Sequence, residues 1–195
     1  MVYLDNAATT KPSDAAIAAG DEIMRECYAN PHSLHDFGIS AEKKVEEARK
    51  TVALAMGVPA DCLYFTSGGT MSDNIAIRGF LSGKRGGRII TSAFEHPAVL
   101  ECFKSLEKTF DVVYVSPDKS GKISAESVLA KITPDTALVS IMHINNETGA
   151  INEIEEIAEY TKRLGVPFHT DAVQAFLKTP FRYYKVGMAS VSGHK

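Results

Sequence analysis

The sequence predicts a three-layer α/β/α fold with a mainly parallel β-sheet, and three observations support this. Short apolar runs alternate with amphipathic stretches along most of the chain, and strands that alternate with helices in this way form parallel sheets. The 195 residues are enough to bury a sizeable core. Hydrophobic residues make up 45% and charged residues 23%, which is typical of globular rather than disordered proteins.

The first part of the chain is expected to be helical. Ser13 is a suitable N-cap for a helix that runs to about residue 29, where Asn30-Pro31 breaks the pattern. A second helix is expected over residues 40–56, because apolar side chains recur at helical spacing and Gly57 is a natural stop. The apolar face of this second helix consists of Val45, Ala48, Val52 and Ala55.

Strands and helices are then expected to alternate over the rest of the chain. Short apolar runs predict strands at residues 62–66, 88–91, 111–115, 137–142, 166–170 and 188–192. The segments between them predict helices at residues 70–81, 97–109, 125–132 and 154–164. Ligands of such sheets bind beyond the carboxyl ends of the strands, so polar residues at those ends are the candidate site residues.

Composition and charge exclude several classes of protein. The net charge of −3 argues against a nucleic-acid binder, and the longest apolar runs are too short to span a bilayer. Residues 1–10 contain an acid and no apolar stretch, so we expect no signal peptide. Cys27, Cys62 and Cys102 are too few and too widely spaced for a disulfide framework, which favours a cytoplasmic location.

Five polar clusters follow the expected strands. They are Ser67-Gly68-Gly69-Thr70, Glu95-His96, Asn145-Asn146-Glu147, Asp171 with Gln174, and Ser192-Gly193-His194-Lys195. Each cluster alone is compatible with an ordinary turn. Because the carboxyl ends of parallel strands meet at one edge of a sheet, the five clusters together indicate a ligand site there.

The glycine-rich turn at residues 67–70 is compatible with an anion site. Glycines let backbone N–H groups approach an anion, a helix start favours negative charge, and Thr70 adds a hydroxyl donor. A plain turn between a strand and a helix explains the same residues. The turn is neither a Walker loop nor a dinucleotide fingerprint, because it lacks both glycine patterns.

The other clusters offer side chains for acid–base and covalent chemistry. His96 can stack on an aromatic ligand and move protons, or it can simply cap a helix. Asp171 can face a protonated ring nitrogen or cap the next turn, and Gln174 can reach the same ligand or lie in solvent. Lys195 can form a Schiff base if it is desolvated, or it can be an ordinary exposed lysine.

Other reactive side chains fit structural roles better. His32 and His35 follow a proline in a loop, and no carboxylate–histidine pattern accompanies them, so we expect no metal site. Cys27 and Cys102 lie in expected helices and Cys62 begins an expected strand, which is typical of core cysteines rather than nucleophiles.

Seven segments together resemble the cysteine desulfurases, which are pyridoxal-phosphate (PLP) enzymes of aminotransferase class V with the fold type I architecture. The segments follow the family order through nearly the whole chain. They are YLDNAATT at 3–10, NPHSLH at 30–35, FTSGGT at 65–70, EH at 95–96, HINNETG at 143–149, HTDAVQ at 169–174 and SGHK at 192–195. The first segment, the NNETG turn and the SGHK segment are highly specific in combination.

The resemblance implies a role for each matching residue. Lys195 is expected to bind PLP covalently and, with His96, to move protons. His96 is also expected to stack on the PLP ring, and Asp171 to hold the ring nitrogen. Gln174 would donate to the phenolate oxygen, with Asn146 on the same side and near the substrate carboxylate. The residues expected around the phosphate are Gly69, Thr70, Ser192 and His194. The residues expected at the substrate entrance are Asn6 and Ala7.

Three features depart from the family pattern. Met71 replaces a glutamate that many relatives have after the phosphate-loop threonine, and His32 replaces a common serine. The segment between Asp171 and Lys195 is slightly short for the best-known branch. The subfamily is therefore not assigned.

Members of this family are longer than this chain, which is expected to be the N-terminal part of one. Residues 1–14 are expected to associate with a small domain, and residues 15–195 to form an incomplete large PLP-binding domain. The nucleophilic cysteine and the arginine for the substrate carboxylate are expected beyond Lys195. A polypeptide that continues past this lysine is expected in preference to a natural fragment.

The activity implied by the resemblance is removal of sulfur from L-cysteine, which yields alanine and an enzyme persulfide. The sulfur is expected to pass to an iron–sulfur scaffold or a thiolation protein, and the enzyme to be a homodimer. No nucleic-acid or membrane partner is expected. Two alternatives stay open: another class V PLP enzyme, such as a selenocysteine lyase or a small aminotransferase, and an inactive PLP-fold binding module.

Overall fold

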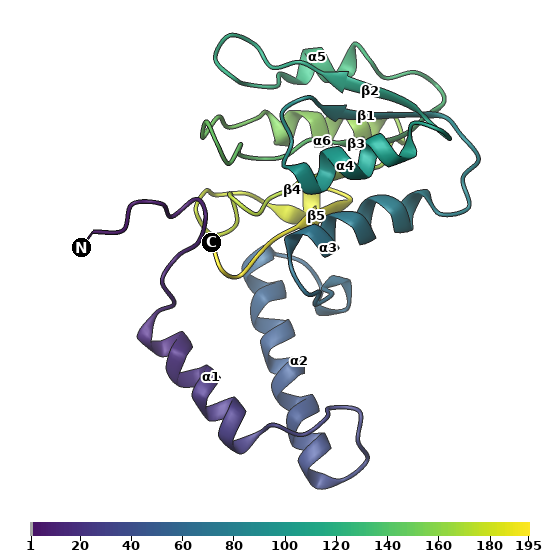
Figure 1. Ribbon diagram of the computed structural model, residues 1–195. Helices are drawn as coiled ribbons and strands as arrows, with labels where there is room; N and C mark the ends of the chain where they lie inside the picture. Colours follow the sequence, from purple (N-terminus) through teal and green to yellow (C-terminus); the bar gives the residue numbers. More distant parts are fainter. Residues whose placement is uncertain (1) are drawn as a thin grey trace. The chain divides into compact units, whose positions relative to one another are not determined.

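The computed structural model describes residues 2–195, and its residues 88–190 contain a five-stranded, all-parallel sheet (Figure 1). The strand order is β2-β1-β3-β4-β5. The strands are β1 (Arg88–Ser92), β2 (Asp111–Val115), β3 (Thr136–Ser140), β4 (Phe168–Asp171) and β5 (Met188–Ser190). The helices are α1 (Asp14–Glu26), α2 (Asp36–Met56), α3 (Gly69–Asn74), α4 (Pro97–Leu106), α5 (Ala125–Leu129) and α6 (Ile154–Arg163). Shorter segments are η1 (Ala60–Cys62), η2 (Ile75–Gly79) and η3 (Tyr183–Lys185).

The described chain divides into two compact units. The first unit runs up to Phe65 and also includes His194. The second unit comprises Thr66–Gly193 together with Lys195. Helices α1 and α2 therefore belong to the first unit, and the sheet with α3 to α6 belongs to the second. Within residues 2–195, no helix combines the length and the apolarity needed to cross a bilayer.

Two apolar clusters pack on opposite faces of the sheet in the second unit. Ile89 of β1 belongs to a cluster with Val99 and Phe103 of α4, whereas the next residue, Ile90, belongs to a cluster with Ile157 of α6. Consecutive strand residues point to opposite faces, so helices cover both sides of the sheet. All five side chains are fully buried, and each contributes about 1.5–3 kcal/mol by its removal from water. The predicted three-layer fold is confirmed.

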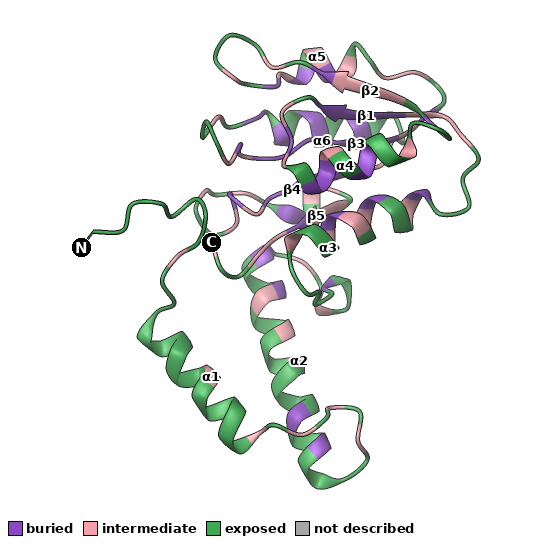
Figure 2. Cartoon of the chain, viewed as in Figure 1, coloured by how far each residue is buried: buried purple, intermediate pink, exposed green. Residues whose placement is uncertain are grey.

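Helix α1 starts where the sequence predicts. The hydroxyl of Ser13 accepts a hydrogen bond from the Ala16 N–H at 3.2 Å, which confirms the predicted N-cap. The helix ends at Glu26, three residues earlier than expected. Every residue of α1 is exposed or half-buried (Figure 2).

Helix α2 starts earlier than predicted, at Asp36 rather than near residue 40. Nδ1 of His35 accepts a hydrogen bond from the Gly38 N–H at 3.2 Å, so a histidine replaces the usual serine or aspartate as the N-cap. The helix ends at the predicted Gly57, which adopts the left-handed conformation with φ 70°.

The strand predicted at residues 62–66 is wrong. Residues 60–62 form the short turn η1, and no other strand of residues 2–195 pairs with the residues that follow it. The guanidinium of Arg49 on α2 donates to the Leu63 carbonyl and lies 5.0 Å from the centre of the Phe65 ring. These contacts attach the segment to α2 rather than to a neighbouring strand.

The helix predicted at residues 70–81 forms but is not a uniform α-helix. It begins at Gly69 as α3 and changes to π-helical hydrogen bonding over η2. Helices α4 and α5 are each three residues shorter than predicted. Beyond α4, Thr109 N–H bonds to the Leu106 carbonyl at 2.9 Å, which is a turn rather than a continued helix. The π-helical turn η2 is of a type that often occurs at functional sites.

Candidate functional site

Most predicted site residues of the second unit follow the carboxyl ends of strands. Asp171 is the last residue of β4, and its register partner Ser190 ends β5 shortly before Lys195. His96 follows β1, and Asn146 lies in the loop that follows β3. All strands run in parallel, so these loops leave the same edge of the sheet.

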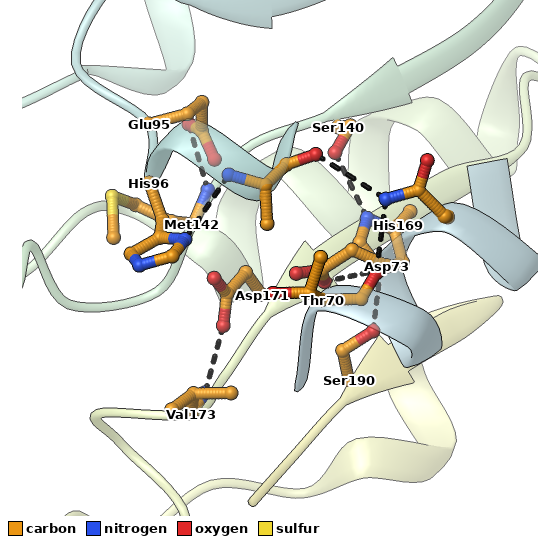
Figure 3. Close-up of polar contacts among 12 residues, drawn as sticks. Thr70, Asp73, Glu95, His96, Ser140, Met142, His169, Asp171, Val173 and Ser190 are labelled. Carbon is orange, nitrogen blue, oxygen red and sulfur yellow. Dashed lines mark hydrogen bonds and ion pairs between the residues drawn. The ribbon is translucent and has the colours of Figure 1, made fainter. Parts of the chain in front are cut away.

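The Asp171 carboxyl is buried at this edge. Asp171 is only 5% exposed. Its Oδ1 accepts a hydrogen bond from the Val173 N–H at 2.9 Å (Figure 3). Burial raises the pKa of Asp171, whereas the Val173 N–H and, next, the nearby His96 and Lys195 lower it. The ionised form of Asp171 therefore depends on cationic groups around it.

His96 is fixed at the start of α4. Its Nδ1 accepts a hydrogen bond from the Ala98 N–H at 3.1 Å, so His96 is the N-cap of this helix. In the neutral ring the proton then lies on Nε2. The side chain is half-buried. Both sequence interpretations of His96 are therefore compatible, because the residue caps α4 with one nitrogen and leaves the other available.

Glu95, next to His96, is a buried acid that joins two strand ends. Its Oε1 accepts from the Ser92 hydroxyl at 2.5 Å. It also accepts from the Met142 N–H at 3.0 Å (Figure 3), so Glu95 connects the end of β1 with the segment after β3. Burial raises the pKa of Glu95 from 4.5 to about 8, although these two donors oppose the shift. Oε2 is also buried and has no hydrogen-bond partner. Burial therefore favours the neutral form of Glu95, whose bond to Met142 holds the loop that carries His96.

The start of α3 is close to the segment after β4. Gly69 is half-buried, and a Cβ at this position would lie 3.3 Å from Cγ2 of Val173. Thr70 is exposed, and its carbonyl accepts from Asn74 Nδ2 at 2.9 Å, which leaves the hydroxyl for other contacts. A glycine at position 69 therefore allows a close approach between the first turn of α3 and Val173.

Asn145 organises the loop that carries Asn146. Oδ1 of Asn145 accepts from the N–H groups of Glu147 and Thr148, each at 2.9 Å, and Nδ2 donates to the Phe94 carbonyl at 2.7 Å. These bonds connect the loop after β3 with the loop before His96. Asn146 itself is half-buried.

The remaining predicted residues of the second unit are also close to strand ends. Gln174 lies in the turn after β4, is 9% exposed, and its Oε1 is 3.4 Å from Lys178 Nζ. Ser192 and Lys195 follow β5 and are half-buried. The turn that holds Gln174 is anchored to β5 because the Ala172 N–H bonds to the Ser190 carbonyl at 2.8 Å.

Three predicted site residues belong to the first unit. Asn6 and Ala7 are exposed and lie in a turn at the N-terminal end. The carbonyl of His194 accepts from the Thr10 N–H at 2.9 Å, and its Nδ1 is 3.3 Å from the Thr9 hydroxyl. The polypeptide around residues 6–10 is therefore bonded to His194 within this unit.

Sequence reasoning missed two buried polar residues behind Asp171. Asp73 on α3 is 1% exposed and His169 on β4 is 0% exposed. His169 lies in a recognised motif but received no role, and Asp73 was not considered. A usable signal for Asp73 is its position four residues before the apolar Ile77, on the face of the helix that packs inward.

Comparison with known sequences shows close similarity over the full chain. Residues 2–195 match the family model described as aminotransferase class-V. The chain is 41% identical to the cysteine desulfurase IscS of Dictyoglomus turgidum and 42% identical to a cysteine desulfurase of Nostoc sp., each over 199 residues. Both alignments cover 100% of this chain and 50% of the relative. The chain thus spans about half the length of the curated relatives it matches.

Comparison with solved structures gives the same result. The structure described as SspA in complex with cysteine has a TM-score of 0.94 at 36% identity. The alignment covers 100% of this chain and 57% of the SspA chain. A NifS-like protein has a TM-score of 0.93 at 40% identity, and the alignment covers 99% of this chain and 55% of that protein's chain. These similarities confirm both the predicted fold and the predicted resemblance. The chain belongs to the aminotransferase class-V family.

Proposed function

We propose that this chain is the cofactor-binding part of a PLP-dependent cysteine desulfurase. The observation that carries the proposal is the buried carboxyl of Asp171 at the end of β4, on the edge of the sheet that His96 and Lys195 also follow. A buried carboxylate needs a cation or several donors. The protonated nitrogen of a pyridine ring meets that need, and the carboxylate in turn keeps the nitrogen protonated.

The start of α3 suits the phosphate of the same ligand. Gly69 has no side chain to block the approach of the backbone, and the hydroxyl of Thr70 is not used by a hydrogen bond that we observe. In the proposal these two residues, with Ser192 and His194, hold the phosphate. A fixed phosphate would anchor the ring while bonds at its other side change.

When bound, PLP supplies an electron-withdrawing ring that stabilises negative charge next to the substrate amine. In the proposal, Lys195 uses its unprotonated Nζ to hold the cofactor covalently, and then moves protons at the substrate. His96 stacks on the ring, and its Nε2, the nitrogen not used to cap α4, exchanges protons. Gln174 and Asn146 donate to the oxygen-bearing edge of the ring, and Asn146 also binds the substrate carboxylate.

The proposed substrate is L-cysteine. The chain is similar to a protein whose structure was solved in complex with cysteine, and the curated relatives carry the name cysteine desulfurase. In the proposed reaction an enzyme thiol attacks the sulfur of L-cysteine, an S–S bond forms, and the C–S bond breaks. The carbon that loses sulfur takes a proton, so the products are alanine and an enzyme persulfide.

The proposal places the attacking thiol in the part of the relatives' length that this chain does not span. Burial raises the pKa of the Cys102 thiol, which disfavours the nucleophilic thiolate. Cys27 and Cys62 belong to the first unit. Neither corresponds to the nucleophilic cysteine, which the resemblance implies lies beyond Lys195. In the proposal residues 1–14 associate with a small domain, and Asn6 and Ala7 of this segment line the substrate entrance. Residues 15–195 belong to the large domain.

Partners and location extend the same proposal. The resemblance to cysteine desulfurases implies a sulfur acceptor of the iron–sulfur scaffold or thiolation type. It also implies a homodimer in the cytoplasm. These statements rest on the resemblance alone.

The activity is tested by incubating L-cysteine and a dithiol reductant with the PLP-loaded protein, in a polypeptide that also contains the region that supplies the attacking thiol in the proposal. We expect alanine and sulfide in equal amounts, because the reductant releases the persulfide sulfur as sulfide. The Lys195→Ala variant should release neither product. A PLP-loaded protein that consumes L-selenocysteine but not L-cysteine, or neither amino acid, would contradict the proposal.

A further inference from the structure

A chain of buried polar side chains lies behind Asp171 in the second unit. His169 precedes Asp171 by two residues on β4, so both side chains point to the same face of the sheet. Nδ1 of His169 lies 2.9 Å from the Ser140 hydroxyl on β3, and Nε2 lies 3.1 Å from the Ser190 hydroxyl on β5 (Figure 3). The imidazole therefore connects the strands on both sides of β4.

Asp73 of α3 completes this chain. Its Oδ1 lies 3.7 Å from His169 Nε2 and has no hydrogen-bond partner, and the carboxyl is close enough to Ser190 for that hydroxyl to influence its pKa. Burial, and next the charge of Asp171, raise the pKa of Asp73, although the Ser190 hydroxyl opposes this. Burial lowers the pKa of His169 to about 4. Burial therefore favours the neutral form of both groups.

If Asp73 and His169 are both neutral, the hydrogen bonds of this buried polar network can all run in one direction. If Asp73 is protonated, it can donate to the Ser190 hydroxyl oxygen, and Ser190 can then donate to Nε2 of His169, which lies 3.1 Å from it. The neutral imidazole keeps its one proton on Nδ1 and donates it to Ser140. Ionised Asp73 would instead place a second negative charge in the same buried region as Asp171, which low dielectric makes costly.

Asp73 also lies on the same side of α3 as the proposed phosphate residues. Gly69 and Asp73 are four positions apart, so they share a helix face. Gly69 lies close to Val173, whose N–H bonds to Asp171, and Asp73 Oδ1 lies 3.7 Å from Nε2 of His169, which precedes Asp171 by two residues on β4. The face of α3 is thus close to the polypeptide around Asp171 at two points.

We propose that Asp73 is a positioning residue of the cofactor site, which holds the start of α3 against β4 and β5 through Ser190 and His169. It thereby fixes the distance between the phosphate residues of α3 and the ring carboxylate of Asp171. This inference rests on the proposed function, because it concerns the same cofactor. Asp73 does not touch PLP in this proposal and acts only through the residues that do.

The test compares Asp73→Asn with Asp73→Ala in the PLP-loaded protein. The asparagine amide is neutral and donates to Ser190, so it should bind PLP within about threefold of the unsubstituted protein and keep its visible absorbance. The alanine variant loses buried hydrogen bonds, so its PLP dissociation constant should rise at least about tenfold and the absorbance of bound PLP should shift. Ile77→Ala serves as the matched control, since it removes buried apolar volume one turn further along the same helical segment. It should lower the melting temperature without shifting the absorbance.

A second readout does not depend on PLP. Nitrogen NMR of the His169 imidazole should show a neutral ring with its proton on Nδ1 in the unsubstituted protein and in Asp73→Asn. A proton on Nε2 in the unsubstituted protein would overturn the direction of donation.

Three outcomes overturn the inference: wild-type affinity and absorbance in Asp73→Ala, an equal loss in Asp73→Asn, or the same absorbance shift in Ile77→Ala. An unsubstituted protein that does not bind PLP at all would refute the proposed function first, and the inference with it. The two failures are therefore distinguishable by the behaviour of the unsubstituted protein.

Discussion

Val173 contacts both Asp171 and the position of Gly69. Its N–H donates to Asp171 Oδ1 at 2.9 Å, and its Cγ2 would lie 3.3 Å from a Cβ at position 69. One residue of the turn after β4 therefore touches the carboxyl proposed for the ring nitrogen and the turn proposed for the phosphate. Small shifts in this turn should affect both ends of the site together.

Asp171→Asn should impair cofactor chemistry without harming the fold. Asparagine keeps an oxygen that accepts from Val173, but it removes the charge that holds the ring nitrogen protonated. One charge-assisted hydrogen bond is worth about 1.5–3 kcal/mol, and the loss in turnover should be larger. We expect altered absorbance of bound PLP and severe loss of alanine production, with an unchanged melting temperature of the PLP-free protein. Near-normal turnover would reduce Asp171 to a cap of the turn.

Two substitutions of His96 should separate its capping role from its proposed role at the ring. His96→Ala removes both the cap of α4 and the imidazole, so it should lose about 1 kcal/mol of stability and also retain PLP poorly. Asparagine is a good N-cap, so His96→Asn should restore the stability but not the PLP retention. Thermal unfolding and dialysis against PLP-free buffer measure the two effects. If His96→Asn retains PLP as the unsubstituted protein does, the imidazole is structural only.

Glu95→Gln should change how stability depends on pH. The pKa of Glu95 is raised from 4.5 to about 8 in the folded state, so the folded protein binds more protons than the unfolded chain between these values. The contribution of Glu95 to stability is therefore fully present below pH 4.5 and is lost as the pH rises to about 8. The slope from this one group is about 1.4 kcal/mol per pH unit. Glutamine keeps the acceptor for Ser92 and Met142 but does not titrate.

Denaturant unfolding of the PLP-free protein between pH 5 and pH 8 measures this effect. The unsubstituted protein should lose stability more steeply than Glu95→Gln as the pH rises. Parallel curves for the two proteins would show that Glu95 is ionised in the folded state.

Two glycines of the first unit should respond to alanine in opposite directions. A Cβ at Gly38 would lie 2.2 Å from the Ser33 carbonyl oxygen, so Gly38→Ala must displace the backbone before α2. A Cβ at Gly20, inside α1, has no atom within 4 Å, so Gly20→Ala should stabilise the helix by about 0.4–1 kcal/mol. Helicity and thermal unfolding report both changes. Equal tolerance at the two positions would contradict the close approach at Gly38.

The fold was predictable from sequence wherever an apolar run pairs with a neighbouring strand of the sheet or a helix has a clear stop. Strand β1 and helix α6 form close to where their patterns predict them. The run at 62–66 has the same composition as a strand but contacts Arg49 of α2 instead, and sequence periodicity does not reveal which neighbour a run will have. The early start of α2 was missed because histidine is an uncommon cap.

The candidate site was predictable where residues belong to recognisable motifs at strand ends, as Asp171 does. Asp73 was not predictable in this way, because an acid in a helix is usually exposed and no local pattern identifies its burial. Its environment is created by β4 and β5, which lie about 100 residues further along the chain and approach α3 only in the folded structure.

The central claim, that Lys195 holds PLP covalently, is tested most directly by peptide mapping after borohydride reduction of the PLP-loaded protein. Reduction fixes the bond between the lysine nitrogen and the cofactor, so the modified peptide can be identified by mass. Our account predicts a pyridoxyl group on Lys195. A pyridoxyl group found only on another lysine, or no modification in a protein that contains PLP, would contradict it.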